Sequence, residues 1–233
     1  MEERIRTQRT RRGARLVQDG AVLSEILRRP GPTHDLFDIL AACIAMLAPG
    51  PRLAMLGFAG GGIVAPLRKM GFARPVDAVD LSSLGVDLYR ELSAPWAFEV
   101  RLEQAEASAW LARRRAPYDA ILEDLSVPGS EGVTKPRVSL EVLPELIQRR
   151  LGPGGVAITN LLPVPGMSWR SLLARVAATH RSAQLIQHED YENRVLVAGE
   201  SLVDARKASR LLRRALHAIG SRLAAGVRLR RYR

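Results

Sequence analysis

Asp80, Asp124 and Asn160 are the side chains whose types and positions best suit chemistry on a bound ligand. Each of them ends or directly follows an apolar run of strand length. In a parallel sheet the carboxyl ends of neighbouring strands meet at one edge, where such folds bind their ligands. We therefore expect these side chains to converge on one site, in which Asp80 accepts hydrogen bonds from the hydroxyls of a ribose.

A glycine turn precedes Asp80 and completes this pattern. Residues 53–56 are an apolar run typical of a strand buried on both faces, and Gly57-Phe58-Ala59-Gly60-Gly61-Gly62 leads from them into a helical pattern. Glycines let the backbone approach a ligand, and an acid about 20 residues further on is placed to bind a ribose. The pattern predicts a nucleoside-cofactor site made by Gly57, Ala59, Gly60, Gly61, Asp80 and Leu81. The alternative is that the glycines only allow close helix–strand packing.

Strands and helices alternate along the rest of the chain. We expect strands at 76–79, 97–102, 118–123, 156–159, 183–187 and 194–198, and helices at 34–47, 84–92, 106–115, 168–179 and 202–219. This alternation predicts an α/β fold with a doubly wound, mostly parallel, seven-stranded Rossmann-like sheet. A short N-terminal hairpin precedes the sheet and a basic helix follows it.

Further candidate residues follow the later strands of this sheet. Gln104, Ala105 and Glu106 follow the third strand, at the edge that Asp124 and Asn160 also reach. Each acid or amide has an alternative role. Asp80 is then a solvated strand-end acid, Glu106 opens a helix whose dipole suits an acid, Asp124 caps the following loop or helix, and Asn160 is a turn residue.

The composition excludes several classes of protein. The chain has 233 residues and is 47% hydrophobic, enough for one sizeable α/β domain with small additions. Its single cysteine allows no internal disulfide, and its four histidines lack ligand spacing, so we expect no metal. No apolar run approaches the roughly 20 residues of a membrane span, and no signal peptide is evident. We therefore expect a soluble, cytoplasmic protein.

The net charge of +11 is concentrated at the two ends of the chain. Residues 1–30 hold 8 arginines and 4 acids, residues 201–233 hold 10 basic residues and 1 acid, and residues 31–200 hold 17 basic and 19 acidic residues. The basic ends either bind an anionic partner or stay solvated. We expect four segments: a basic flexible arm at 1–13, a β-hairpin with an Asp19-Gly20 turn at 14–30, a nucleoside-cofactor-binding domain at 31–200, and a basic amphipathic helix with its tail at 201–233.

Seven segments between about residues 14 and 162 share one family pattern. They are DGAVLSE, PTHDLFDIL, LGFAGGG, AVDLSS, QAEASAWL, YDAILEDLSVP and LGPGGVAITN. Together they resemble the spermidine synthase (polyamine aminopropyltransferase) family, within the class I S-adenosylmethionine-dependent methyltransferase fold. The resemblance implies that the glycine turn faces the methionine part of the cofactor, that Asp80 holds the ribose and that Glu106 contacts the adenine amino group. It also implies that Asp124 is the general base on an attacking amine. From their positions at strand ends we expect Asp124 and Asn160 to bind the substrate.

The same resemblance implies the cofactor and the partners. The cofactor is decarboxylated S-adenosylmethionine or S-adenosylmethionine itself, the acceptor is a small amine or another small molecule, and the protein forms a homodimer. Two features depart from the family. Val127 stands in LSVP where the family usually has a second acid that helps to hold a cationic amine. The larger N-terminal β-domain of the family is reduced to one hairpin, so the acceptor pocket is either open or completed by another subunit.

Three functions stay open at the level of the sequence. The first is an aminopropyltransferase-like enzyme that uses the decarboxylated cofactor. The second is a methyltransferase that uses S-adenosylmethionine, and the third is a non-catalytic fold relative that binds partners through its basic ends. The family pattern favours the first, and acidic residues around the acceptor pocket would strengthen it. Val127 favours the second or the third.

Overall fold

Alternate side chains of the strand Leu53–Leu56 (β4) enter two different cores. Leu53 and Met55 pack with the helix Leu36–Leu47 (α1), and Ala54 and Leu56 pack with helices on the opposite face. Because all four side chains are buried, the strand is covered on both faces, as its unbroken apolar sequence predicts. The computed structural model describes residues 5–18, 20–129 and 132–233.

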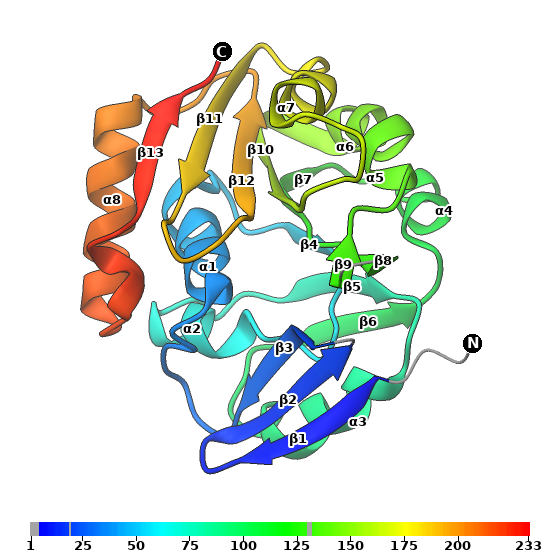
Figure 1. The fold of residues 1–233 in the computed structure, drawn as a ribbon, viewed down its shortest axis with the longest axis vertical. Coiled ribbons are helices and arrows are strands. Elements are labelled where there is room, and N and C mark those ends of the chain that lie inside the picture. The colour runs from blue at the N-terminus through cyan, green and yellow to red at the C-terminus, as the bar shows by residue number, and fades with distance from the viewer. Residues whose placement is uncertain (1–4, 19, 130–131) are drawn as a thin grey trace.

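An eight-stranded sheet lies at the centre of the described chain (Figure 1). Its order is β13-β11-β12-β10-β7-β4-β5-β6; the strands from β10 to β6 are parallel, and β12, β11 and β13 add antiparallel. The bounds are β5 Val76–Asp80, β6 Val100–Gln104, β7 Tyr118–Glu123, β10 Leu151–Leu161, β11 Ser182–Gln187, β12 Arg194–Gly199 and β13 Arg228–Arg231. The chain winds from β4 to β5 and β6 and returns to β7, which creates a switch point between β4 and β7. The predicted doubly wound α/β fold is confirmed, with eight strands in place of seven.

Helices cover both faces of this sheet (Figure 1). The face of Met55 is covered by α1, α2 (Val64–Lys69) and α8 (Ala205–Ala218), and the other face by α4 (Ala107–Ala112), α6 (Leu143–Arg150) and α7 (Trp169–Ala177). The remaining helices are α3 (Leu84–Leu92), α5 (Val138–Glu141) and the 3₁₀ turn η1 (Arg222–Ala224). Within the described ranges, no helix is both long enough and apolar enough to cross a membrane.

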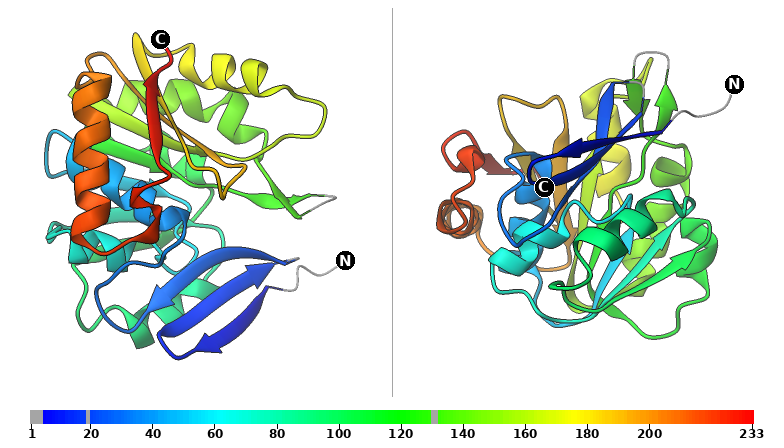
Figure 2. Two further views of the ribbon diagram at one scale, coloured as in Figure 1. Left: turned by 60° about the vertical axis from the view of Figure 1, so that its left-hand side comes forward. Right: turned by 90° about the horizontal axis from the view of Figure 1, so that it is seen from below.

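A smaller sheet of three strands lies against the glycine turn and α3 (Figure 2). Its strands are β1 (Arg6–Thr10), β2 (Gly13–Gln18) and β3 (Ala21–Leu27). The predicted hairpin corresponds to β2 and β3, and Asp19 of its turn lies outside the described residues. The expectation of a flexible arm is wrong for Arg6–Thr10, which pairs with β2 along its whole length. Contacts with other elements hold this polar strand in place, since Arg9 also forms an ion pair with Glu91 of α3 at 2.8 Å.

The tail expected after the basic C-terminal helix contains a further strand. Residues 228–231 form β13, the edge strand of the main sheet, and pair with β11. Leu229 packs against the core cluster, whereas Arg228, Arg230 and Arg231 are exposed. An arginine-rich edge strand is a usual protection against unwanted strand pairing. The basic residues of this end therefore belong to an ordered strand and to the exposed face of α8.

Two local features near the site also differ from the sequence-based expectation. The Gly- and Pro-rich loop after β7 contains a short hairpin, β8 (Val127–Gly129) and β9 (Gly132–Thr134). The N-cap of α1 is Asp35, whose side chain accepts a hydrogen bond from Leu36 N at 2.6 Å. Thr33, two residues earlier, donates its hydroxyl to Asp38 at 2.8 Å.

Candidate functional site

A cavity of about 480 Å³ opens at the carboxyl ends of β4, β5, β7 and β10. The three-stranded sheet and the β8–β9 hairpin supply its other walls, and the two lie on the same side of the molecule in Figure 2. The residues expected in the site that line this cavity are Gly57, Ala59, Asp80, Leu81, Asp124 and Asn160. Gly60, Gly61, Gln104, Ala105 and Glu106 are not part of its lining. The structure thus brings strand-end residues of four strands to one cavity at the switch point.

Asp80 fixes the shape of the glycine turn. Its Oδ2 accepts hydrogen bonds from the N–H groups of Phe58 and Ala59 at 2.7 and 2.8 Å, and its Oδ1 accepts one from Ser82 N at 2.9 Å. Ala59 has a positive φ of 43°, a conformation that is unfavourable for a non-glycine residue and is held here by these bonds. The carboxylate therefore joins the end of β5 to the turn after β4.

Close packing explains why glycines are needed in this turn. A Cβ on Gly57, whose φ is +90°, would lie 2.7 Å from the carbonyl oxygen of Asp124. A Cβ on Gly60 would lie 2.7 Å from the Ile26 side chain of β3. Gly62 N donates to Ser24 Oγ of β3 at 2.8 Å. The small sheet therefore sits directly on the glycine turn, and several of the N–H groups that the sequence offers to an anion are bonded within the protein.

Glu106 opens a helix, which was the alternative to a role in ligand binding. It is the N-cap of α4, and its two carboxylate oxygens accept hydrogen bonds from Ser108 N at 3.0 Å and Ala109 N at 2.8 Å. Partial burial is the largest single effect and raises the pKa of Glu106, but the hydrogen bonds from the Ser108 hydroxyl and from the backbone N–H groups of Ser108 and Ala109 together outweigh it, so the pKa is lowered. Gln104 is also engaged locally, donating to the carbonyl of Leu81 at 3.0 Å.

Asp124 lies at the end of a hydrogen-bonded chain of side chains. Asn160 Nδ2 donates to Asp124 Oδ1 at 2.7 Å, and Asn193 Nδ2 donates to Asn160 Oδ1 at 3.0 Å. Burial raises the pKa of Asp124 to about 6, with smaller contributions from the charges of Glu123 and Asp80, while the Asn160 hydrogen bond and the charge of Lys135 oppose the shift. A carboxyl with this pKa is charged at neutral pH and is close to the range of a general base.

A buried ion pair supports the loop behind Asp124. The Lys135 ammonium, fully inaccessible, lies 2.8 Å from Glu123 Oε1 and 2.8 Å from the carbonyl oxygen of Leu125. Ser139 Oγ donates to the same carboxylate oxygen at 2.9 Å. The pair ties the end of β7 to the residues after β9, so it fixes the start of the loop that carries the β8–β9 hairpin.

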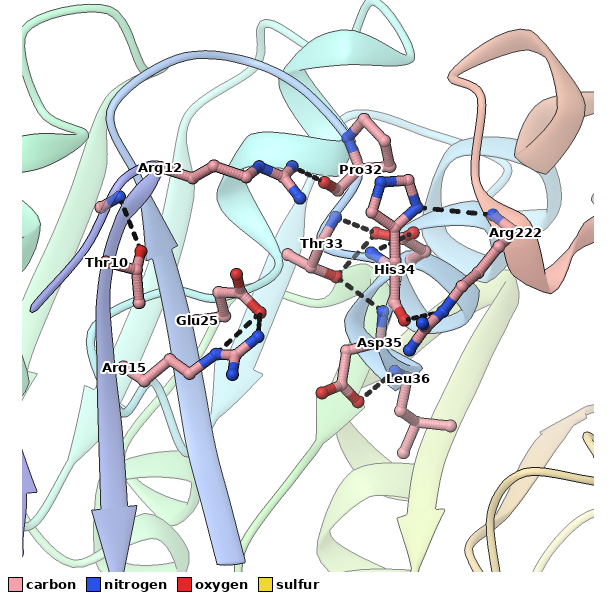
Figure 3. A network of polar contacts seen from close by, with 12 residues as sticks. Thr10, Arg12, Arg15, Glu25, Pro32, Thr33, His34, Asp35, Leu36 and Arg222 are labelled. Carbon is pink, nitrogen blue, oxygen red and sulfur yellow. Dashed lines mark hydrogen bonds and ion pairs between the residues drawn. The ribbon is translucent and has the colours of Figure 1, made fainter. Parts of the chain in front are cut away.

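Asp35 and Tyr191 add two further polar side chains to the lining. The Asp35 carboxylate caps α1, and Arg222 of η1 donates to the carbonyl of the neighbouring residue His34 at 3.1 Å (Figure 3). Burial, together with the nearby Asp35 carboxylate, raises the pKa of Tyr191. Sequence reasoning missed Asp35, Tyr191, Asn193 and the Lys135–Glu123 pair. The one signal for them was the position of Asn193, directly before a predicted strand.

The cavity has an acidic lining. Asp35, Asp80 and Asp124 are its carboxylates, and none of its described lining residues is a lysine or an arginine. Excess negative charge in a concave site raises the local concentration of cations. Among the described residues no group of three or more His, Cys, Asp or Glu side chains is arranged to hold a metal ion. The arrangement suits an organic cation next to a carboxylate that can take a proton.

Comparison with known proteins identifies the fold. No protein-family model matches the chain and no curated protein matches its sequence, but solved structures do. Human methyltransferase-like protein 13, in complex with SAH, has a TM-score of 0.61 at 18% identity, over 77% of this chain and 90% of its own. Spermidine synthase from Thermotoga maritima has a TM-score of 0.62 at 12% identity, over 96% of this chain and 81% of its own.

A second spermidine synthase structure, in complex with the transition state analogue AdoDATO, matches equally well. Its TM-score is 0.63 at 12% identity, over 96% of this chain and 82% of its own. At these identities the likeness shows the fold alone. The protein has the Rossmann-like α/β fold of the class I methyltransferases.

Proposed function

We propose that this protein is a transferase that binds decarboxylated S-adenosylmethionine in the cavity and transfers its aminopropyl group to a small amine. The observation that carries the proposal is an acidic cavity at the switch point, with Asp124 in its wall and neither lysine nor arginine in its described lining. Both reactants of this transfer are cations: the cofactor carries a sulfonium and the primary ammonium of its aminopropyl group, and the acceptor amine arrives as an ammonium. An acidic cavity favours the binding of both.

The nucleoside half of the proposed site lies around Asp80. Asp80 Oδ1 has one recorded donor, Ser82 N, so it keeps a lone pair for a ribose hydroxyl. Leu81 and Leu84 beside it are 68% and 44% exposed. We assign this apolar surface to the adenine ring, which gains by leaving water. Glu106 keeps its role as a helix cap in this arrangement, and no adenine contact is assigned to it.

The choice of the decarboxylated cofactor follows from the absence of a suitable partner for a carboxylate. The α-carboxylate of S-adenosylmethionine would enter a cavity whose described charged residues are all acidic. The N–H groups of Phe58, Ala59 and Gly62, which would otherwise bind an anion, already donate within the protein. An unpaired buried carboxylate is costly, so the form that lacks it should bind more tightly.

Asp124 supplies the base in the proposed step. Asp124 first takes a proton from the bound ammonium, which leaves a neutral amine with a free electron pair. That nitrogen then attacks the propyl carbon bonded to the sulfonium sulfur, the carbon–sulfur bond breaks, and its electron pair leaves with methylthioadenosine, a neutral thioether. The nitrogen of the product is a secondary ammonium. Because Asn160 donates to Oδ1, we assign Oδ2 to the amine. The Asn193–Asn160 chain then holds the carboxylate in one orientation.

The spermidine synthase structures support this proposal, since they match 96% of the chain, including the small N-terminal sheet. Methyl transfer from S-adenosylmethionine is the second candidate, and Val127 favours it. This side chain stands at the position where the spermidine synthase pattern has a second acid, and it is exposed at the cavity. A methyl acceptor would not need that acid.

Product analysis separates the candidates. The protein is incubated with decarboxylated S-adenosylmethionine or with S-adenosylmethionine and a panel of amines, and the nucleoside products are measured by chromatography. Release of methylthioadenosine that depends on an amine, and that Asp124→Asn abolishes, is the expected result. Release of S-adenosylhomocysteine instead would establish methyl transfer. A chain that forms neither product and binds neither cofactor would be a non-catalytic relative.

A further inference from the structure

The exposed apolar side chains of the described chain concentrate at the cavity. Six large hydrophobic residues are exposed, and four of them, Val22, Leu81, Leu84 and Val127, line the cavity. Exposed apolar side chains that gather in a concave site usually mark the place of an apolar ligand group. A nucleoside bound at Asp80 would cover Leu81 and Leu84, which lie beside that residue, and would leave Val22 and Val127 uncovered.

The remaining apolar wall comes from two elements that face the cavity from outside the main sheet. Val22 and Leu23 belong to β3, and Val127, Pro128 and Val133 belong to the β8–β9 hairpin. In the described residues of these two elements, the lining has no charged side chain. The carboxylates lie instead at strand ends and at the start of α1. The cavity therefore combines an acidic part with a separate apolar part.

Of the three carboxylates, Asp124 is the one best placed for an acceptor amine. Asp80 accepts three backbone hydrogen bonds and lies on the nucleoside side. Asp35 caps α1 through Leu36 N and raises the pKa of the adjacent Tyr191. Asp124 receives a donor from Asn160 on one oxygen only. The site thus has one evident position for the ammonium of an acceptor, and Leu125, Val127 and Pro128 along the following loop are apolar.

We propose that the acceptor is a primary monoamine with an apolar alkyl or aryl body, rather than a diamine or polyamine. Its amine lies at Asp124 and its body lies against Val22, Leu23, Val127 and Val133. The inference rests on the proposed function, since it names the acceptor of that reaction. A second ammonium on the same ligand would lose its hydration against valine side chains without gaining a carboxylate partner, which is costly.

Matched amines of equal chain length test this inference directly. Binding of 1-aminohexane and of 1,6-diaminohexane to the full chain is measured by ligand-observed NMR and calorimetry, with and without methylthioadenosine. The monoamine should bind about tenfold or more tightly than the diamine, because the second ammonium has no partner. Lengthening the monoamine from four to six carbons should tighten binding by about fourfold per methylene group.

Two aspartate variants add a control. Val127→Asp should tighten diamine binding by up to about fivefold, since it places a carboxylate in the apolar wall. Val203→Asp changes a valine of almost the same exposure, 37% against 36%, that does not line the cavity, and should leave both amines unaffected. Circular dichroism confirms that both variants are folded.

The outcomes separate this inference from the proposed function. Equal or tighter binding of the diamine to the unmodified protein would overturn it, and so would binding of neither amine. An amine preference as expected, without any binding of methylthioadenosine, would uphold the apolar amine site and count against the proposed transferase. Binding of methylthioadenosine together with a preference for the diamine would support the proposed transferase and overturn the monoamine inference. Asp35 would then be the second ammonium site, and Asp35→Asn should remove the preference for the diamine.

Discussion

Replacement of Asp124 by Asn should stabilise the folded protein at neutral pH while it removes the proposed base. The two side chains have the same shape, and the amide oxygen of Asn can still accept the hydrogen bond that Asn160 donates at 2.7 Å. What the substitution removes is a charge that is held out of water. Burial raises the pKa of Asp124 from 3.8 to about 6 in the folded state, so the folded protein carries this charge at a cost.

The magnitude follows from the pKa difference between the folded and unfolded states. At 1.36 kcal/mol for each pKa unit, a shift of about two units destabilises the folded protein by at most about 3 kcal/mol at neutral pH. The folded state binds the proton more tightly, so this penalty is absent below the unfolded pKa, grows as the pH rises and is complete above about pH 6. The Asn variant lacks the penalty at every pH.

Urea unfolding at two pH values measures the effect. The variant should gain up to about 3 kcal/mol in the free energy of unfolding at pH 7.5, and about a third of that gain at pH 4.5. Asp87→Asn, at a side chain that is 84% exposed, should change stability by less than about 0.5 kcal/mol at either pH. A loss of stability at pH 7.5, or an equal gain at both pH values, would refute the desolvated charge on which the role of Asp124 depends.

Three further variants, two substitutions and one truncation, should lower the stability of the folded protein. Lys135→Met should reduce the free energy of unfolding by about 3–5 kcal/mol because it leaves the Glu123 carboxylate buried without its cation, and Lys135→Met combined with Glu123→Gln should recover most of the loss in urea unfolding. Gly57→Ala should cost about 2 kcal/mol more than Gly71→Ala, because both residues have φ near +90° but only the Gly57 Cβ meets backbone, 2.7 Å from Asp124 O. A chain that ends at residue 227 should unfold at a lower urea concentration than the full chain because it lacks β13, whereas Arg228→Ser and Arg231→Ser should change stability little, since both side chains are exposed.

Each of these expectations has a contrary result. A Lys135→Met variant as stable as the unmodified protein would show that the ion pair does not secure the loop. Equal losses of stability for Gly57→Ala and Gly71→Ala would mean that the glycine turn is not closely packed against the Asp124 backbone. An unchanged unfolding midpoint after truncation would mean that β13 adds no stability to the sheet.

The central strands could be predicted because largely apolar strands are stable only where both faces of the sheet are covered. Residues 53–56 and 76–79 are buried runs, and the glycine turn between them follows from spacing alone. The edge strands β1 and β13 could not be predicted, because they are arginine-rich and carry little apolar periodicity. They are held by pairing with a neighbouring strand and by the ion pair of Arg9 with Glu91, which are tertiary contacts.

The candidate site was also predicted only in part, because some of its residues are brought together by tertiary contacts. Asp80, Asp124 and Asn160 could be placed together because parallel strands end at a common edge, and all three line the cavity. Glu106 was ambiguous, since an acid before a helix suits a cap as well as a ligand, and the structure shows the cap. Asp35 and Tyr191 come from segments that are far apart in the sequence, so only the fold reveals that they face the same cavity.

Calorimetric titration with decarboxylated S-adenosylmethionine, S-adenosylmethionine and methylthioadenosine tests the proposed cofactor most directly. The acidic cavity predicts that the decarboxylated form and methylthioadenosine bind, and that S-adenosylmethionine binds more weakly because its carboxylate has no cationic partner in the described lining. Tighter binding of S-adenosylmethionine would contradict aminopropyl transfer and favour methyl transfer. Absence of binding by all three would contradict a nucleoside site at Asp80.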